Sequence, residues 1–263
     1  MNPGLGNLSM AVVAAVNDEQ VLRQNLLRSP MLATGDLPLI AERGFDSAGK
    51  AYNAGAARSD AEVLIFAHQD VYFPPGWQNR LAAAIRDLEG RLAPWAVLGV
   101  WGIRPNGACC GRVWCTGSGQ EFQAPVCGIE RVASIDEIVI VVNARAGLRF
   151  DEQLPNYHLY ATDIVLQAAE RGLESHVFDG PVVHNSRTVP QLNRGYVEAY
   201  RYMQRKWSKR LPLQTCVLPV TRFGWPLRRY RARVALNLML RRVVVHPRHA
   251  APQVLSQHLG YES

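Results

Sequence analysis

The chain has 263 residues, of which 48% are hydrophobic and 19% charged, so its composition is that of a globular protein with a sizeable core. Its formal net charge is +7, no apolar run approaches the roughly 18 residues of a membrane-spanning helix, and no basic stretch typical of a signal peptide opens the sequence. The five cysteines form no C-x-x-C pair, which favours reduced structural thiols of a cytoplasmic protein over disulfides or a zinc site.

Strand and helix patterns alternate through the first 190 residues. Apolar runs predict strands at 10–16, 37–41, 63–67, 96–101, 138–142, 177–178 and 182–183. Helical spacing and small-residue composition predict helices at 21–27, 49–57, 77–88 and 160–171. The segment 107–125, which is rich in Gly and Cys, is expected to be irregular. This alternation predicts an α/β domain over residues 8–190, with a mostly parallel central sheet flanked by helices.

The character of the chain changes after residue 190. Tyr196, Tyr200, Met203 and Trp207 share one helical stripe, and a second helix is predicted at 227–245. Fourteen of the 29 Lys and Arg residues fall within 194–249, beside a single acid. We therefore expect residues 191–263 to form a basic helical extension.

This one-sided charge suits a helix that lies on an anionic membrane surface, and a solvated helix face is the alternative. Trp225 and several apolar residues interleave with the arginines, as membrane contact requires. Nucleic acid is an unlikely partner, because the aromatic residues follow core spacing and no RNA-binding or DNA-binding motif is present.

The most informative segment is AEVLIFAHQDVYFPPGW at 61–77, in which a buried strand ends in His68, Gln69 and Asp70. Open α/β sheets bind their ligands at the carboxyl ends of such strands. Asp70 is therefore a candidate ligand for a hard cation, with a turn-capping role as the alternative. No P-loop, dinucleotide-binding G-x-G-x-x-G or G-x-S-x-G element competes with this interpretation.

Four elements together resemble a known family: a first strand that ends in Asn17-Asp18, AYNAGAA at 51–57, HQDV at 68–71, and a late DEQL…YATD…ERGL segment within 151–173. In this order the chain resembles a family 2 glycosyltransferase of the Rossmann-like GT-A fold. The most similar branch is the group of glycosyltransferase-like proteins named after a streptomycin-biosynthesis protein, in which HQDV is typical. The resemblance covers residues 8–190.

The resemblance implies transfer of a sugar from a nucleotide-diphosphate sugar to an acceptor hydroxyl, with a divalent metal, Mn²⁺ or Mg²⁺, and inversion at the anomeric carbon. Most members bind this metal with an Asp-x-Asp motif, whose first carboxylate is replaced here by His68. Asp70 then needs a second ligand, and the resemblance suggests the late His184. The missing carboxylate leaves a non-catalytic nucleotide-sugar-binding or scaffold relative as the alternative function.

The resemblance also suggests residues for the remaining roles. An inverting transfer needs a general base, and Asp163 in YATD is the expected one, with helix capping as its alternative. Asn17, Asp18 and Asn53 are expected at the nucleotide, with close helix packing as the alternative for Asn53, and Gln69 is expected at a phosphate or a metal-bound water.

Three further residues are candidates for contact with the donor sugar or the acceptor. Trp101 could stack on a sugar ring or pack in the core, and Asp136 with Glu137 could bind hydroxyls or remain a solvated pair. The expected acceptor is a glycan or a lipid-linked molecule of bacterial cell-envelope synthesis. We therefore expect a cytoplasmic enzyme, with peripheral attachment at the inner membrane face through the basic extension as a further expectation.

Overall fold

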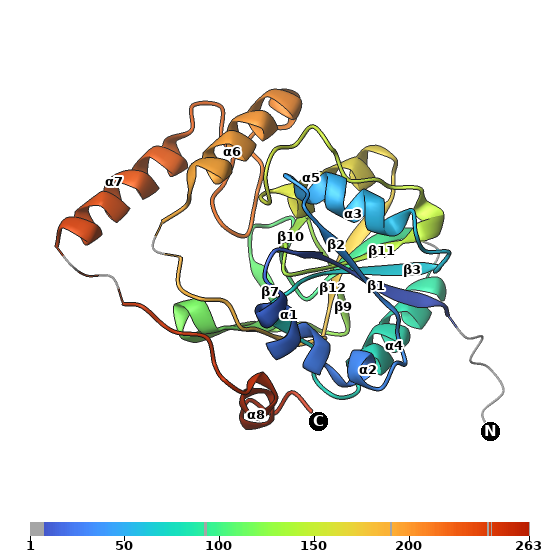
Figure 1. The fold of residues 1–263 in the computed structure, drawn as a ribbon. Helices are drawn as coiled ribbons and strands as arrows, with labels where there is room; N and C mark the ends of the chain where they lie inside the picture. Colours follow the sequence, from blue (N-terminus) through green and yellow to red (C-terminus); the bar gives the residue numbers. More distant parts are fainter. Residues whose placement is uncertain (1–7, 92–93, 190, 241, 243, 263) are drawn as a thin grey trace, which may run out of the picture.

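The computed structural model, which describes residues 8–91, 94–189, 191–240, 242 and 244–262, has a central sheet of seven strands in the order β2-β1-β3-β11-β5-β12-β9 (Figure 1). These strands are β1 (Met10–Val16), β2 (Leu39–Arg43), β3 (Val63–His68), β5 (Trp95–Gly99), β9 (Ile129–Arg131), β11 (Val139–Asn143) and β12 (Glu174–Phe178). β1 pairs in parallel with β2 and β3, and β12 with β5, whereas β11 and β9 run against their neighbours. Five of the seven strands therefore point one way, as a mostly parallel sheet requires.

Helices cover both faces of this sheet, because alternate residues of a strand face opposite sides. In β3, Leu64 and Phe66 pack on the side of α3 and α5, whereas Ile65 and Ala67 pack on the side of α1, α2 and α4. Burial on both faces explains why this strand is apolar without interruption. The helices are α1 (Glu19–Gln24), α2 (Pro30–Ala33), α3 (Ala48–Ala56), α4 (Trp77–Glu89) and α5 (Tyr160–Glu170), with 3-10 turns η1 (Leu26–Arg28), η2 (Thr116–Ser118), η3 (Ala144–Ala146) and η4 (Ser208–Arg210).

A smaller second sheet lies beside the first, in the order β10-β6-β7-β13-β4, with β8 paired to β7. Its strands are β4 (Val71–Tyr72), β6 (Trp101–Ile103), β7 (Cys109–Cys115), β8 (Gln120–Ala124), β10 (Ser134–Ile135) and β13 (Val182–His184). β13 runs antiparallel to β4, with His184 opposite Val71. This pairing brings the late histidine next to the HQDV segment.

The prediction of an irregular segment at 107–125 is wrong, because β7 and β8 form an antiparallel pair there. Gly and Cys conceal the strand pattern in the sequence. Gly111 is needed in β7, since its φ is +114° and a Cβ there would lie 2.1 Å from the carbonyl oxygen of Val100.

The C-terminal part contains α6 (Arg194–Lys206), α7 (Trp225–Met239) and α8 (Pro252–His258). The predicted stripe of α6 is buried in the core beside α5. α7 projects from the body and buries only Leu227, and it ends before the predicted limit at 245 (Figure 1). α8 was not predicted. Among the described helices none has the length and apolarity to cross a bilayer.

Candidate active site

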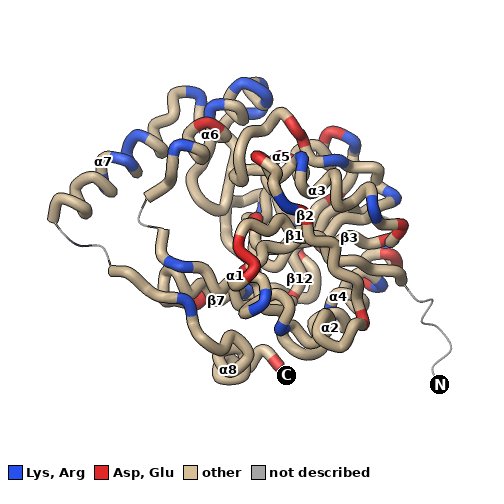
Figure 2. The backbone as a smooth tube through the Cα atoms, in the orientation of Figure 1, with Lys and Arg blue, Asp and Glu red and all other residues tan. Residues whose placement is uncertain are grey.

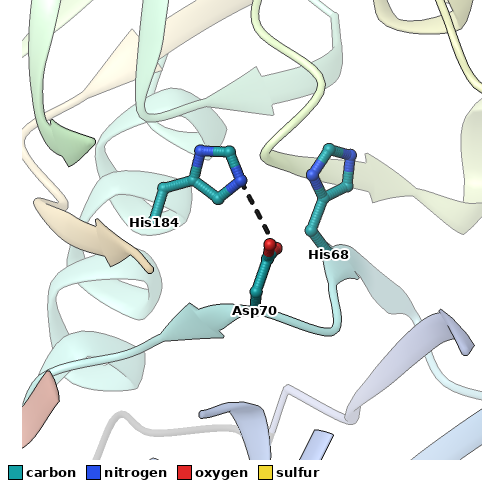
Figure 3. Close-up of side chains that lie close together, drawn as sticks. All are labelled: His68, Asp70 and His184. Carbon is teal, nitrogen blue, oxygen red and sulfur yellow. Dashed lines mark ion pairs between the residues drawn. The ribbon is translucent and has the colours of Figure 1, made fainter. Parts of the chain in front are cut away.

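Asp70 lies in the two-residue turn between β3 and β4, at the carboxyl end of β3, which pairs in parallel with β1 and antiparallel with β11. Its side chain is 14% exposed. The Nε2 atom of His184 lies 3.3 Å from its Oδ1 atom (Figure 3). The two residues predicted as metal ligands are therefore in contact, because the second sheet folds β13 back onto β4.

His68 joins this pair and completes a group that could hold a metal. One ligand atom from each of His68, Asp70 and His184 lies within 4.8 Å of the others. The hydroxyl of Tyr160 donates a hydrogen bond to the carbonyl oxygen of Glu137 and lies 2.8 Å from Nε2 of His68. That arrangement puts the proton of His68 on Nε2 and leaves the Nδ1 lone pair free as a ligand.

The cluster could hold a metal cation if that cation displaces the proton of His184. Burial lowers the pKa of His68 to about 4, so its imidazole is neutral at pH 7. Burial disfavours the charged forms of both Asp70 and His184, but the attraction between the two charges is stronger. This attraction holds the pKa of the Asp70 carboxyl below its usual range and raises the pKa of His184 to about 10. A metal bound at Nε2 of His184 would take the place of that proton.

A second cation reaches Asp70 from the C-terminal segment. The Nη2 atom of Arg248 lies 3.5 Å from Oδ2 of Asp70, and its Nε–H donates to the carbonyl oxygen of Asn185. The neighbouring backbone is docked as well, because the side chain of Asn185 bonds both the N–H and the carbonyl of His249. We call residues 246–262 the C-terminal strap.

Two cavities meet at the cluster. The first, of about 640 Å³, opens at the ends of β1 and β2, and the second, of about 470 Å³, lies toward β6, β7 and β13. His68 and Asp70 line both cavities. A ligand in the first cavity and a ligand in the second would therefore both touch the candidate metal site.

Of the four residues predicted at the nucleotide, two line the first cavity: Asn17 and Gln69. Gln69 accepts hydrogen bonds from the backbone N–H groups of Asn17 and Asp18, and its amide donates to Oδ1 of Asn17. Asp18 instead caps α1 by accepting from the N–H groups of Gln20 and Val21.

Asn53 lies away from the first cavity, so the structure does not support a donor contact for it. Its amide donates to Phe150 O and to Glu152, and its Oδ1 accepts from the N–H of Phe150. Asn53 therefore ties α3 to the loop before α5.

Asp163 is 1% exposed and lines neither cavity. Its carboxylate accepts hydrogen bonds from Gln167 and from the indole of Trp207, and it forms an ion pair with Lys206. Burial raises the pKa of this carboxyl even though Lys206 opposes the shift. The side chain of Asp163 is thus held by Lys206 and Trp207, and the structure does not support its predicted role as the base.

The second cavity instead contains Asp136, Glu137 and Trp101, the three residues predicted at the sugar or acceptor. Glu137 accepts a hydrogen bond from the N–H of Leu159, and Asp136 from the N–H of Ile138. Burial raises the pKa of both carboxyls, and the charge of Asp136 adds to the effect on Glu137. A raised pKa is what a general base needs near neutral pH.

Sequence reasoning missed three participants. His68 was visible as the first residue of HQDV, but a packed histidine looks the same in a sequence. Cys115 lies with its Sγ atom 3.9 Å from Nδ1 of His184, which leaves Nε2 of that ring to face Asp70. No sequence signal separates Arg248 from the other arginines of the basic extension.

No family model and no curated protein matches the chain. Among solved structures it resembles GalNAc-T7 crystallised with UDP, GalNAc and Mn²⁺, at a TM-score of 0.51 and 13% identity over 98% of this chain and 57% of that one. It also resembles the mannosyltransferase PcManGT from Pyrobaculum calidifontis with GDP-Man and Mn²⁺ (TM-score 0.48, 11% identity, 87% of this chain and 70% of that one) and S. aureus TarS 1-349 with UDP-GlcNAc (TM-score 0.47, 13% identity, 75% and 65%). The likeness to GalNAc-T7 shows the fold: the chain has the predicted GT-A fold and spans 57% of that protein's length.

Proposed function

We propose that this chain is a glycosyltransferase that moves a sugar from a nucleotide-diphosphate donor to an acceptor hydroxyl with the help of a divalent metal. The proposal is carried by the cluster of His68, Asp70 and His184 where two cavities meet. GalNAc-T7, which has the same fold, was crystallised with UDP and Mn²⁺. The HQDV element supports family 2 and its streptomycin-biosynthesis-protein-like branch as the finer assignment.

The first cavity is the proposed donor site, since about 640 Å³ is large enough for a nucleotide. Asn17, held by Gln69, faces the base or ribose, and the diphosphate extends toward Asp70 and Arg248. A metal held by the cluster would stabilise the negative charge of the leaving diphosphate as a Lewis acid. Two imidazole ligands favour Mn²⁺ over Mg²⁺.

The second cavity is the proposed acceptor site. Glu137 or Asp136 takes the proton of the acceptor hydroxyl while that oxygen forms a bond to the anomeric carbon. The bond from this carbon to the diphosphate breaks on the opposite face, and its electron pair stays on the phosphate oxygen. The transfer therefore inverts the anomeric centre. Trp101 offers an aromatic surface to a sugar ring.

The same proposal divides the chain into a catalytic domain at 8–190 and a basic extension at 191–263. The extension would contact an anionic membrane surface at the cytoplasmic face of the inner membrane, where Phe223 and Trp225, 70% and 67% exposed, could insert between headgroups. The acceptor would be a glycan or lipid-linked molecule of cell-envelope synthesis. Nucleic acid is not a proposed partner.

A second candidate is a non-catalytic protein that binds a nucleotide sugar or acts as a scaffold. Two observations favour it: His68 replaces the first carboxylate of the family motif, and Arg248 already neutralises Asp70. In that case donor binding would persist, and no transfer would follow.

The experiment is thermal stabilisation by UDP, GDP, dTDP and CMP, each with and without Mn²⁺, in the native chain and in Asp70→Asn. A ligand that binds the folded state raises the melting temperature by mass action. We expect a shift with one nucleotide that requires Mn²⁺ and is lost in Asp70→Asn.

The matched control is Asp87→Asn, which removes the same charge from an exposed ion pair on α4 and should keep the shift. An equal shift in Asp70→Asn, or no shift with any nucleotide in the native chain, would contradict the donor site. Transfer of radiolabelled sugar to a cell-envelope lipid extract separates the enzyme from the non-catalytic candidate.

A further inference from the structure

A separate cleft lies between α6 and α7, and it shares no lining residue with the two cavities that meet at Asp70. Its volume is about 520 Å³. Four arginines line it, together with Tyr200, Gly224 and Trp225: Arg201, Arg222, Arg228 and Arg231. Figure 2 shows basic residues on both helices, with few acidic residues beside them.

The four arginines of this cleft form no close ion pair within the described residues, although the charge of Arg201 helps to lower the pKa of Glu198. No ion pair joins any of them to an acid within the described part of the chain, whereas Arg194 and Arg210, on or next to α6, pair with Glu198 and Glu170. Like charges repel, so four guanidinium groups around one cleft raise its positive potential. An anion that enters the cleft would relieve that repulsion.

The cleft is built by hydrogen bonds between α6 and the loop that precedes α7. The side-chain amide of Gln204 donates to the carbonyl oxygens of Thr221 and Arg222, and the hydroxyl of Tyr200 accepts from the N–H of Thr221 and donates to the carbonyl of Pro219. These bonds hold the loop before α7 against α6, so the arginines of both elements keep their relative positions.

The first turn of α7 adds to the positive potential. Gly224 precedes this helix in a left-handed conformation, with a φ of +64°, and no side chain caps the first N–H groups, to which Pro226 contributes none. A helix of 15 residues carries a partial positive charge at this end, and uncapped N–H groups are donors for phosphate oxygens.

We propose that this cleft binds a phosphate or diphosphate group. Guanidinium groups match phosphate oxygens with paired hydrogen bonds, and four of them suit a group with two or more negative charges. Phe223 and Trp225, at the mouth, are exposed and apolar, which fits a phosphate attached to a lipid chain. The site does not involve Asp70 and stands independently of the proposed transfer reaction.

The test compares two double variants that lose the same charge. Arg201→Gln with Arg228→Gln removes one cleft arginine from each helix, and Arg229→Gln with Arg233→Gln removes two exposed arginines of α7 that do not line the cleft. Inorganic pyrophosphate binding is measured by calorimetry without divalent metal. We expect about a hundredfold weaker binding in the cleft variant, at roughly tenfold for each lost contact, and less than threefold in the control.

Vesicles distinguish the source of the phosphate. Phosphatidylcholine vesicles with and without phosphatidic acid are sedimented with each variant. Vesicle binding that needs both phosphatidic acid and the cleft arginines would identify the ligand as a lipid headgroup. Binding of pyrophosphate without binding of vesicles would identify it as a free anion. A second cleft variant, Arg222→Gln with Arg231→Gln, should behave like the first. Equal losses in cleft and control variants, or no binding of either probe, would overturn the proposal. Asp70→Asn should leave this binding intact even if the transferase proposal fails.

Discussion

Tyr160 links the candidate metal ligand His68 to the backbone of the second cavity. Its hydroxyl accepts a hydrogen bond from Nε2–H of His68, which fixes the tautomer of that ring, and donates its own proton to the carbonyl of Glu137. Its ring packs against Tyr52 at 5.6 Å and Phe150 at 6.0 Å, so the loss of the hydroxyl alone should preserve the packing. Tyr160 therefore acts on the metal through another residue.

Tyr160→Phe should weaken Mn²⁺ binding about tenfold, because partners that orient a ligand contribute roughly 10-fold to 100-fold to metal affinity. The measurement is a Mn²⁺ titration followed by electron paramagnetic resonance. Tyr230→Phe removes a hydroxyl that accepts from the N–H of Leu192. Tyr230 lines neither cavity and does not contact the His68, Asp70 and His184 group, so this variant should leave the affinity unchanged. Unchanged Mn²⁺ binding in Tyr160→Phe would remove the argument that this hydroxyl sets the ligand tautomer.

Opposite effects on kcat and stability are expected when Glu137 and Asp163 are each replaced by the uncharged amide. Glu137→Gln should lower kcat by about 10²-fold to 10⁴-fold, the range of a general base, while the nucleotide-dependent thermal shift persists. Asp163→Asn should lower the melting temperature and retain most of kcat, because its carboxylate bonds Lys206 and Trp207 and lies outside the cavities. Loss of turnover in Asp163→Asn with normal stability would restore the base role that the sequence predicts.

Lys206 of α6 holds this helix against α5 and against the loop before α5. Its ammonium lies 2.7 Å from Oδ1 of Asp163 and 2.6 Å from Oδ2 of Asp151. Lys206→Met would leave Asp163 buried without its cation, and removal of one partner from a buried pair costs about 3 kcal/mol of unfolding free energy.

The loss of stability in Lys206→Met should be largest near pH 7 and shrink as the pH falls toward 4. Burial raises the folded-state pKa of Asp163, and without Lys206 this pKa rises further, so protonation at low pH stabilises the folded variant. Asp151 acts in the same sense at lower pH: despite burial, Lys206 and Tyr202 lower its pKa, and the stability that this gives the native chain is lost only as the pH falls through that lowered pKa.

Urea unfolding of both chains at several pH values measures this difference. Lys50→Met is the control, since it breaks an exposed pair with Asp46 and should change the midpoint little at any pH. A deficit in Lys206→Met that is constant from pH 7 to pH 4 would show that Asp163 does not cause it.

The helices and strands were predictable where hydrophobic period and length agreed. The strand at 10–16 matches β1, and the stripe of Tyr196, Tyr200 and Met203 identified α6, because burial demands those patterns. The hairpin of β7 and β8 was missed because Gly and Cys carry little strand signal and its pairing is a tertiary contact.

The candidate site was predictable only in part, for a related physical reason. Asp70 and His184 could be paired from the family resemblance, and both lie in the cluster. Asp163 and Asn53 matched family positions, yet their partners Lys206 and Phe150 come from distant segments that one sequence does not place. A residue type at the right position predicts a role, whereas access to the cavity depends on packing.

The C-terminal strap docks against the candidate site that the two sheets build. The N–H of His246 donates to the hydroxyl of Thr188, and the hydroxyl of Tyr261 donates to Glu121, so both ends of the strap are docked. Arg248 lies between these anchors and faces Asp70. The basic extension would therefore serve the transfer reaction directly, apart from any role at a membrane.

Arg248→Gln tests this dependence between the two ends of the chain. If the guanidinium turns from Asp70 to the diphosphate when donor binds, its loss should weaken nucleoside diphosphate binding about tenfold to a hundredfold, which is the range of one charge-assisted hydrogen bond. Binding of the parent nucleoside, which has no diphosphate, should stay unchanged. Calorimetry with both ligands in the presence of Mn²⁺ makes the measurement. Arg242→Gln removes the same charge from an exposed position of the basic extension and should affect neither ligand. If Arg248→Gln instead tightens Mn²⁺ and diphosphate binding, the arginine competes with the metal for Asp70, and the strap restrains the site in the absence of donor.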